Sequence, residues 1–104
     1  MAAIADRGPV LPADARAYRH LGPFDADAIP AGLWRRHDLK SGVWGLLSVE
    51  VGSIRFCWDD AEGGTHILSA GDVLLVPPTI PHHLERAGPV TISLAFYSVA
   101  APTA

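Results

Sequence analysis

Short apolar segments, separated by turn residues, dominate the chain after residue 30. Most are rich in β-branched or aromatic residues, which favour strands, and none shows the periodicity of an amphipathic helix. The segments are residues 32–37, 43–51, 53–58, 65–69, 72–77, 82–86 and 90–99. Short strands at this spacing are typical of an all-β barrel or sandwich, so we expect no helix longer than about two turns.

Alternation within these segments predicts which side chains face the core. Every second residue of a strand lies on the same face, so Ile54, Phe56 and Trp58 share one face of their segment. Gly52 separates two apolar segments and predicts a hairpin over residues 43–58. The expected core comprises Ile54, Phe56, Leu74 or Leu75, Ile92, Leu94 and Phe96.

The first 30 residues carry no regular pattern, because prolines and glycines interrupt any helical period. We expect residues 1–10 to form a loose N-terminal segment. A single barrel domain is expected to occupy residues 11–100. A chain of 104 residues that is 49% apolar fits one domain with a packed core.

Composition excludes several classes of function. The net charge of -3 provides no basic surface for nucleic acid. No apolar run approaches the roughly 18 residues needed to cross a membrane, and the first residues do not resemble a signal peptide. The single cysteine, Cys57, cannot form an internal disulfide, so we expect a cytoplasmic protein with an inert, packed thiol.

The stretch "GDVLLVPPTIPHH", residues 71–83, places histidine directly after a rigid bend. Pro77 and Pro78 end the preceding strand because proline donates no backbone hydrogen bond. A fixed bend orients the imidazole of His82, which suits a ligand position. His83 points to the opposite face of a regular strand, where a surface position is expected.

The spacing of Gly71, Pro77 and His82 resembles the second sequence motif of the cupin superfamily, although Thr79 stands where that motif usually has glycine. The resemblance implies a single cupin barrel, also described as a double-stranded β-helix or jelly roll. It also implies that His82 binds a metal inside this barrel.

A second resemblance, over residues 11–97, is to the small cupin family of tellurite-resistance protein B. Its most specific part is "RRHDLKSGVWGLLSVEVGSIRF", residues 35–56, joined by "PPTIPHHLE" and "LAFY". In that family the domain occurs alone or ahead of a methyltransferase. This sequence shows no Gly-rich nucleotide loop, so we expect no methyltransferase. The resemblance then implies a stand-alone cupin related to tellurite resistance or stress response.

The candidate site departs from the usual cupin ligand set. The first cupin motif supplies two histidines and a glutamate, and this chain has Asp38, Lys40 and Gly45 near those places. His37 and His82 are therefore the candidate metal ligands, with a third ligand left open among His83, Glu85 and water. A divalent ion, with zinc preferred, suits neutral imidazole. Structural histidines bonded to backbone or water are the alternative.

Other residues are candidates for binding a small ligand at the barrel mouth; they are Arg35, Lys40, Trp44 and Glu85. Lys40 suits an anionic ligand or an oxyanion, and Arg35 shares a strand face with His37. The alternative interpretations are that Lys40 is a solvated loop residue and that Glu85 forms a simple ion pair. His20 is expected to be exposed and His66 to be structural.

Three functions remain open. The first is a stress protein that binds a metal or a small molecule, and the second is a metal-dependent enzyme of the dioxygenase or isomerase type. The third is an interaction module without chemistry. Exposed sheet edges favour pairing of two copies, so a homodimer is expected.

Overall fold

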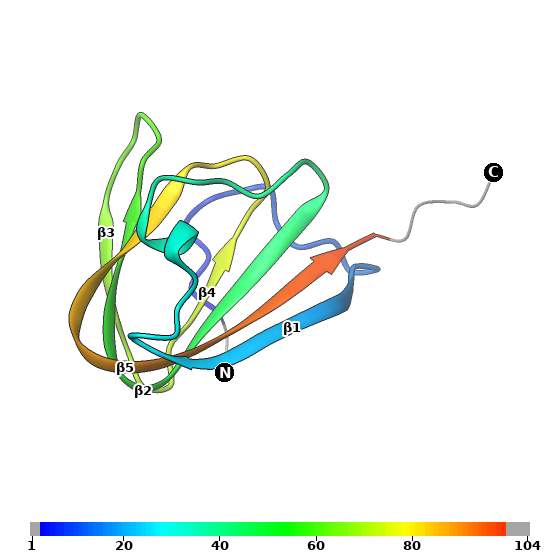
Figure 1. The fold of residues 1–104 in the computed structure, drawn as a ribbon. Helices are drawn as coiled ribbons and strands as arrows, with labels where there is room; N and C mark the ends of the chain where they lie inside the picture. Colours follow the sequence, from blue (N-terminus) through cyan, green and yellow to red (C-terminus); the bar gives the residue numbers. More distant parts are fainter. Residues whose placement is uncertain (1–2, 100–104) are drawn as a thin grey trace.

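The computed structural model describes residues 3–99, which form a five-stranded antiparallel sheet and one short 3-10 helix (Figure 1). The elements are β1 (Arg16–Asp25), η1 (Ala31–Trp34), β2 (Val43–Trp58), β3 (Thr65–Ser69), β4 (Val73–Val76) and β5 (His82–Ser98). The all-β prediction is confirmed. Within residues 3–99, no helix has the length and apolar character that crossing a membrane requires.

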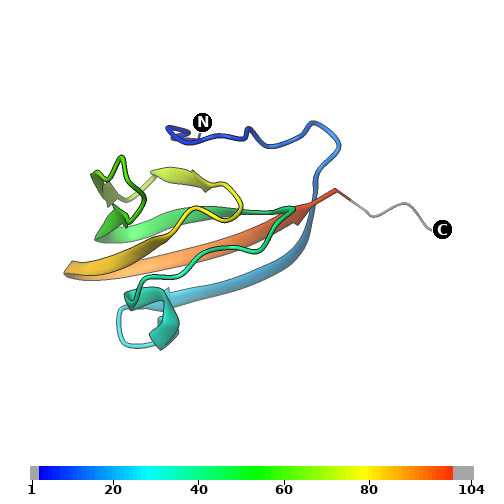
Figure 2. The same cartoon turned by 90° about the horizontal axis from the view of Figure 1, so that it is seen from above.

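The two long strands, β2 and β5, form the centre of the sheet. The strand order is β1-β5-β2-β3, and β4 pairs with the first half of β2. Both long strands bend near their middle, so the sheet curls around the space covered by η1 and its flanking loops (Figures 1 and 2). The concave side of this curved sheet holds the core.

The predicted hairpin at Gly52 is wrong, because β2 runs without a turn from Val43 to Trp58. Gly52 pairs with Val90 of β5, and the register shifts on both sides of it. Its φ of +76° belongs to the left-handed region that glycine tolerates, so the residue forms a bulge that bends the strand. The gap between the predicted segments 82–86 and 90–99 likewise lies inside β5, which is continuous from His82 to Ser98.

Two further predictions about strands differ from the structure. Residues 16–25, expected to be irregular, form the edge strand β1, which tolerates Pro23 because one side of an edge strand needs no partner. Residues 32–37 were predicted as a strand, but Ala31–Trp34 form η1 directly after Pro30. Predicted strands 65–69 and 72–77 correspond to β3 and β4.

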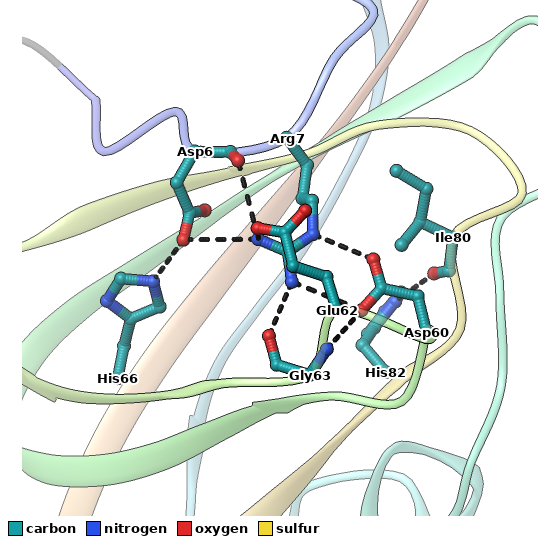
Figure 3. A network of polar contacts seen from close by, with 8 residues as sticks. All are labelled: Asp6, Arg7, Asp60, Glu62, Gly63, His66, Ile80 and His82. Atoms are coloured by element: carbon teal, nitrogen blue, oxygen red, sulfur yellow. Dashed lines mark hydrogen bonds and ion pairs between the residues drawn. The ribbon is translucent and has the colours of Figure 1, made fainter.

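The N-terminal segment, expected to be loose, is attached to the sheet in its described part. Ile4 forms a parallel bridge with Leu74, and the Arg7 side chain is only 8% exposed. The Arg7 guanidinium donates to Asp60 at 2.7 Å and pairs with Glu62 at 3.1 Å (Figure 3). The hydrogen bond from Arg7 holds the pKa of the Asp60 carboxyl below its usual range. Residues 1–2, and residue 100 at the end of the expected domain, lie outside the described residues.

The expected core is largely observed. Ile54, Phe56, Leu74 and Ile92 are at most 1% exposed, and Leu75 is also buried. Leu94 and Phe96 share the inward face but are half-buried, because they line a cavity rather than solid core. This cavity is where the candidate site lies.

Candidate functional site

His37 and His82 lie side by side, as the backbone geometry around them requires. The two residues pair as an antiparallel bridge and exchange both backbone hydrogen bonds, at 3.0 and 2.9 Å. Directly opposed residues of antiparallel strands place their side chains on one face. The ring centroids are accordingly 4.2 Å apart, with the rings inclined at 66°.

The same local contact fixes both imidazoles. Nδ1 of His37 lies 2.8 Å from the carbonyl oxygen of Arg35, and Nδ1 of His82 lies 2.8 Å from that of Ile80 (Figure 3 shows the latter). A carbonyl oxygen only accepts, so each Nδ1 carries the hydrogen and donates. In the neutral rings, Nε2 therefore keeps its lone pair. This is the arrangement in which protein histidines bind metals.

Both histidines line a cavity of about 70 Å³. Of the described residues that line it, only these two carry polar side-chain atoms; the others are Leu33, Leu39, Gly45, Leu47, Phe56, Val76, Leu84, Leu94 and Phe96. A volume near 10–15 Å³ suffices for one water, so this cavity has room for a small ligand or an ion with waters. The site is thus an apolar pocket with a polar end made of two imidazoles.

Burial controls the charge of His82. The residue is 4% exposed, and its ring stacks on Phe56 at a centroid distance of 5.2 Å. Desolvation, together with the neighbouring His37, lowers the pKa of His82 from 6.5 to about 4, although the Ile80 carbonyl acts in the opposite direction. At neutral pH the ring is therefore uncharged and able to act as a ligand.

This shifted pKa predicts a loss of stability in mild acid. The unfolded chain protonates His82 near pH 6.5 and the folded protein only near pH 4, so the unfolded state binds more protons between these values. The free energy of unfolding should fall by about 3 kcal/mol on this account as pH drops through that window, and stay level above it. Urea unfolding of metal-free protein at a series of pH values measures the effect.

Replacing His82 with leucine provides the control for this pH dependence. Leucine keeps the site filled and cannot titrate, so the difference between the two proteins isolates the histidine from acidic groups such as Asp60. Parallel curves of unfolding free energy against pH for the two proteins would contradict the shifted pKa.

The other predicted site residues do not join the histidine pair. The Arg35 and Lys40 side chains are exposed and do not line the cavity. Arg35 lies in the loop after η1 and on no strand, so the strand alternation that predicted its inward placement does not apply. Trp44 is buried elsewhere, and its Nε1–H donates to the Pro9 carbonyl at 3.0 Å. Glu85 accepts from His83 at 2.9 Å and is exposed.

Sequence reasoning missed a second polar cluster, formed by Cys57, Asp59, His83 and Glu85. His83 donates from Nδ1 to Asp59 at 2.7 Å and from Nε2 to Glu85 at 2.9 Å. These bonds, that to Asp59 first, raise the pKa of His83, while burial raises the pKa of the Cys57 thiol. Alternation within each strand places Cys57 and Asp59 on one face of their segment, and His83 and Glu85 on one face of theirs. The sequence does not show that the two strands pair, and only the pairing of Cys57 with His83 brings these four side chains together.

Comparison with protein families gives one informative match. The family model of the TehB-like domain matches residues 19–94, which is most of the chain. A comparison with curated proteins gives no match. Residues 19–94 include the histidine pair and most of the sheet.

Solved structures show the same fold. TehB from Haemophilus influenzae superposes with a TM-score of 0.77 at 24% identity, over 84% of this chain and 32% of that one. A protein from E. coli (strain K12) gives a TM-score of 0.78 at 21% identity, over 90% and 100% of the two chains. HppE in its Fe(II) form gives 0.51 at 20% identity, over 60% and 33%. The predicted cupin fold is confirmed, and the chain spans about a third of the length of TehB.

Proposed function

Because this chain belongs to the TehB-like family, we propose that it is a small cupin that binds a divalent metal ion between His37 and His82, inside the apolar cavity. The observation that carries the proposal is that two imidazole rings lie side by side, each with its Nδ1 bonded to a backbone carbonyl, which leaves Nε2 of each ring for coordination. Zinc is the expected ion because imidazole suits it and the cavity lining offers no thiolate.

The donor set limits what the metal can do. Catalytic zinc usually has three protein ligands, and non-haem iron enzymes use two histidines and a carboxylate. Among the described residues, the cavity lining contributes two imidazoles and no carboxylate. We therefore expect modest affinity, with water or a bound molecule completing the coordination, and we favour binding over the alternative of a dioxygenase or isomerase.

The lining also indicates the chemistry of the molecule that shares the cavity. No described lining residue carries a fixed positive charge, and His82 is neutral at pH 7. Apart from a bound ion, no described lining residue would compensate the desolvation of an oxyanion, and the rest of the cavity wall is apolar. We therefore propose a small, mostly apolar molecule with one polar group, which contacts the imidazoles directly or through the ion. A role in tellurite resistance is a proposal that rests on family membership alone.

Metal titration of matched variants tests this function. We expect zinc binding, measured calorimetrically in a Cys57→Ser background without a histidine tag, to be mostly lost in His37→Ala and in His82→Leu. The reason is that each variant removes one of only two protein ligands, and the Cys57→Ser background excludes binding by the thiol. Leucine at position 82 also preserves packing against Phe56.

His20→Ala is the matched control, since His20 is exposed on β1 and takes no part in the cavity. It should bind zinc like the parent protein. Equal zinc binding by all four proteins, with circular dichroism showing them folded, would refute the metal function. The apolar molecule would then remain as the proposed occupant, to be tested with small apolar fluorophores.

A further inference from the structure

We propose that Cys57, His83 and Glu85 form a second metal site, on the face of the sheet opposite to the cavity, that takes a thiophilic divalent ion such as zinc. One ligand atom from each residue lies within 4.8 Å of the other two. A thiolate, an imidazole and a carboxylate are all zinc ligands, and three of them with one open position match the count of a catalytic or exchangeable zinc centre.

Strand pairing places these residues together. Cys57 of β2 lies directly opposite His83 of β5, and Glu85 follows two residues later on the same face of β5. Their positions alternate with His82 and Leu84, which line the cavity. The cluster is therefore separated from the His37–His82 pair by the sheet itself, and each site can be altered without removing a ligand of the other.

The geometry requires only a small contraction. Zinc bonds of about 2.0–2.3 Å in a tetrahedron separate neighbouring ligand atoms by roughly 3.3–3.8 Å. The ligand atoms are at most 4.8 Å apart, and rotation of the exposed Glu85 and half-buried His83 side chains can shorten these separations to that range. The Cys57 thiol is buried. Cys57 lies between two neighbouring strands, opposite His83 of β5 on one side and Thr65 of β3 on the other.

Asp59 already holds His83 in the orientation that a metal needs. Its carboxylate accepts the Nδ1 hydrogen at 2.7 Å, so Nε2 points to Glu85. A carboxylate–histidine–metal arrangement of this kind fixes the ring and raises the basicity of its ligating nitrogen. Metal binding would replace the Nε2 proton between His83 and Glu85 and the thiol proton of Cys57, which releases two protons to solvent.

One cation competes for the same carboxylate. Arg55 lies 3.8 Å from Glu85, but about half of each of the two side chains is exposed. A surface pair of this kind contributes little and is screened by salt. Arg55 can therefore turn into solvent when an ion binds.

Cobalt titration of the reduced, untagged protein tests this site. Co²⁺ occupies zinc sites and gives a thiolate-to-metal charge-transfer band in the near ultraviolet, which histidine and carboxylate ligands do not produce. We expect the band in the parent protein and in the controls His20→Ala and His37→Ala, and we expect it to saturate at one ion in His37→Ala, where the cavity site has lost a ligand. Cys57→Ser should abolish it, and His83→Ala and Glu85→Gln should weaken Co²⁺ binding at least about tenfold.

Asp59→Asn should keep the band and weaken binding by about 10–100-fold, as expected of a residue that positions a ligand without touching the metal. Absence of the band in the parent protein would overturn the proposal. Unchanged Co²⁺ affinity in both His83→Ala and Glu85→Gln, with the band present, would also overturn the proposal. That result would show that the thiol binds the ion without His83 and Glu85. These two variants retain the thiol, so the test holds even if Cys57→Ser fails to fold. Loss of zinc at the cavity in His37→Ala, with this band intact, separates the two sites.

Discussion

Replacing Gly52 with alanine is expected to destabilise the fold by about 2–5 kcal/mol, which combines the cost of a left-handed backbone with that of overpacking. A Cβ at this position would lie 1.9 Å from the carbonyl oxygen of Pro89 and 2.8 Å from its carbon. Both are backbone atoms of the paired strand, so no side-chain rotation relieves the contact. Straightening the bulge would remove the bend that brings both halves of β2 around the core.

Gly42→Ala is the matched control, because Gly42 has a similar φ of +81° and nothing within 4 Å of the added carbon. It should lose only about 1–2 kcal/mol, the cost of the left-handed conformation. Equilibrium unfolding in urea, followed by tryptophan fluorescence, compares the two variants. Equal losses of unfolding free energy in the two variants would show that β5 can shift at Pro89. The short distance between position 52 and the Pro89 carbonyl would then not limit the side chain at position 52.

The mistaken hairpin at Gly52 shows where sequence reasoning ends. A positive φ is the property that both a turn and a bulge require of glycine, so the residue alone does not distinguish them. The difference lies in Pro89 and Val90, which pair beside Gly52 from far along the chain. By contrast, β3 was predicted to the residue, because glycines at both ends limit it locally.

Edge strand β1 was missed for a related reason. Eight of its ten side chains are exposed, so the apolar alternation that reveals a half-buried strand is absent. The strand forms because its backbone pairs with the C-terminal half of β5, and the local sequence does not reveal this pairing. Local sequence therefore predicted the strands with a buried face and failed where pairing alone forms the strand.

The candidate site was predictable to the extent that its residues lie on regular strands. His82 and His37 were named from the proline-braced bend and from the family-like "RRHDLK", and the structure brings their rings together. Arg35 was misplaced because η1 interrupts the assumed strand. Glu85 was misplaced although alternation already separates it from His82, since positions that differ by three lie on opposite faces.

Phe56 connects the stability of the fold to the histidine site, and its replacement by alanine should cost about 3–5 kcal/mol. The ring is 1% exposed and contacts Trp58 edge-on at a centroid distance of 4.7 Å. The ring also stacks on His82 at a centroid distance of 5.2 Å, and it lines the cavity. Removing it would leave a void that neighbouring residues of the two central strands fill only in part. The loss of the stack should also let the His82 ring move, so zinc binding should weaken along with stability.

Phe96→Ala is the matched control, because it removes a ring of the same size from a less buried position. Phe96 lines the same cavity but is half-buried, so less contact is lost and the decrease in unfolding free energy should be clearly smaller. Urea unfolding of the two variants and the parent, at pH 7 and without metal, gives the difference directly. A loss below about 1 kcal/mol for Phe56→Ala would place that ring at the surface. The stacking contact that orients His82 would then be absent, and the proposed metal site would lose its structural support.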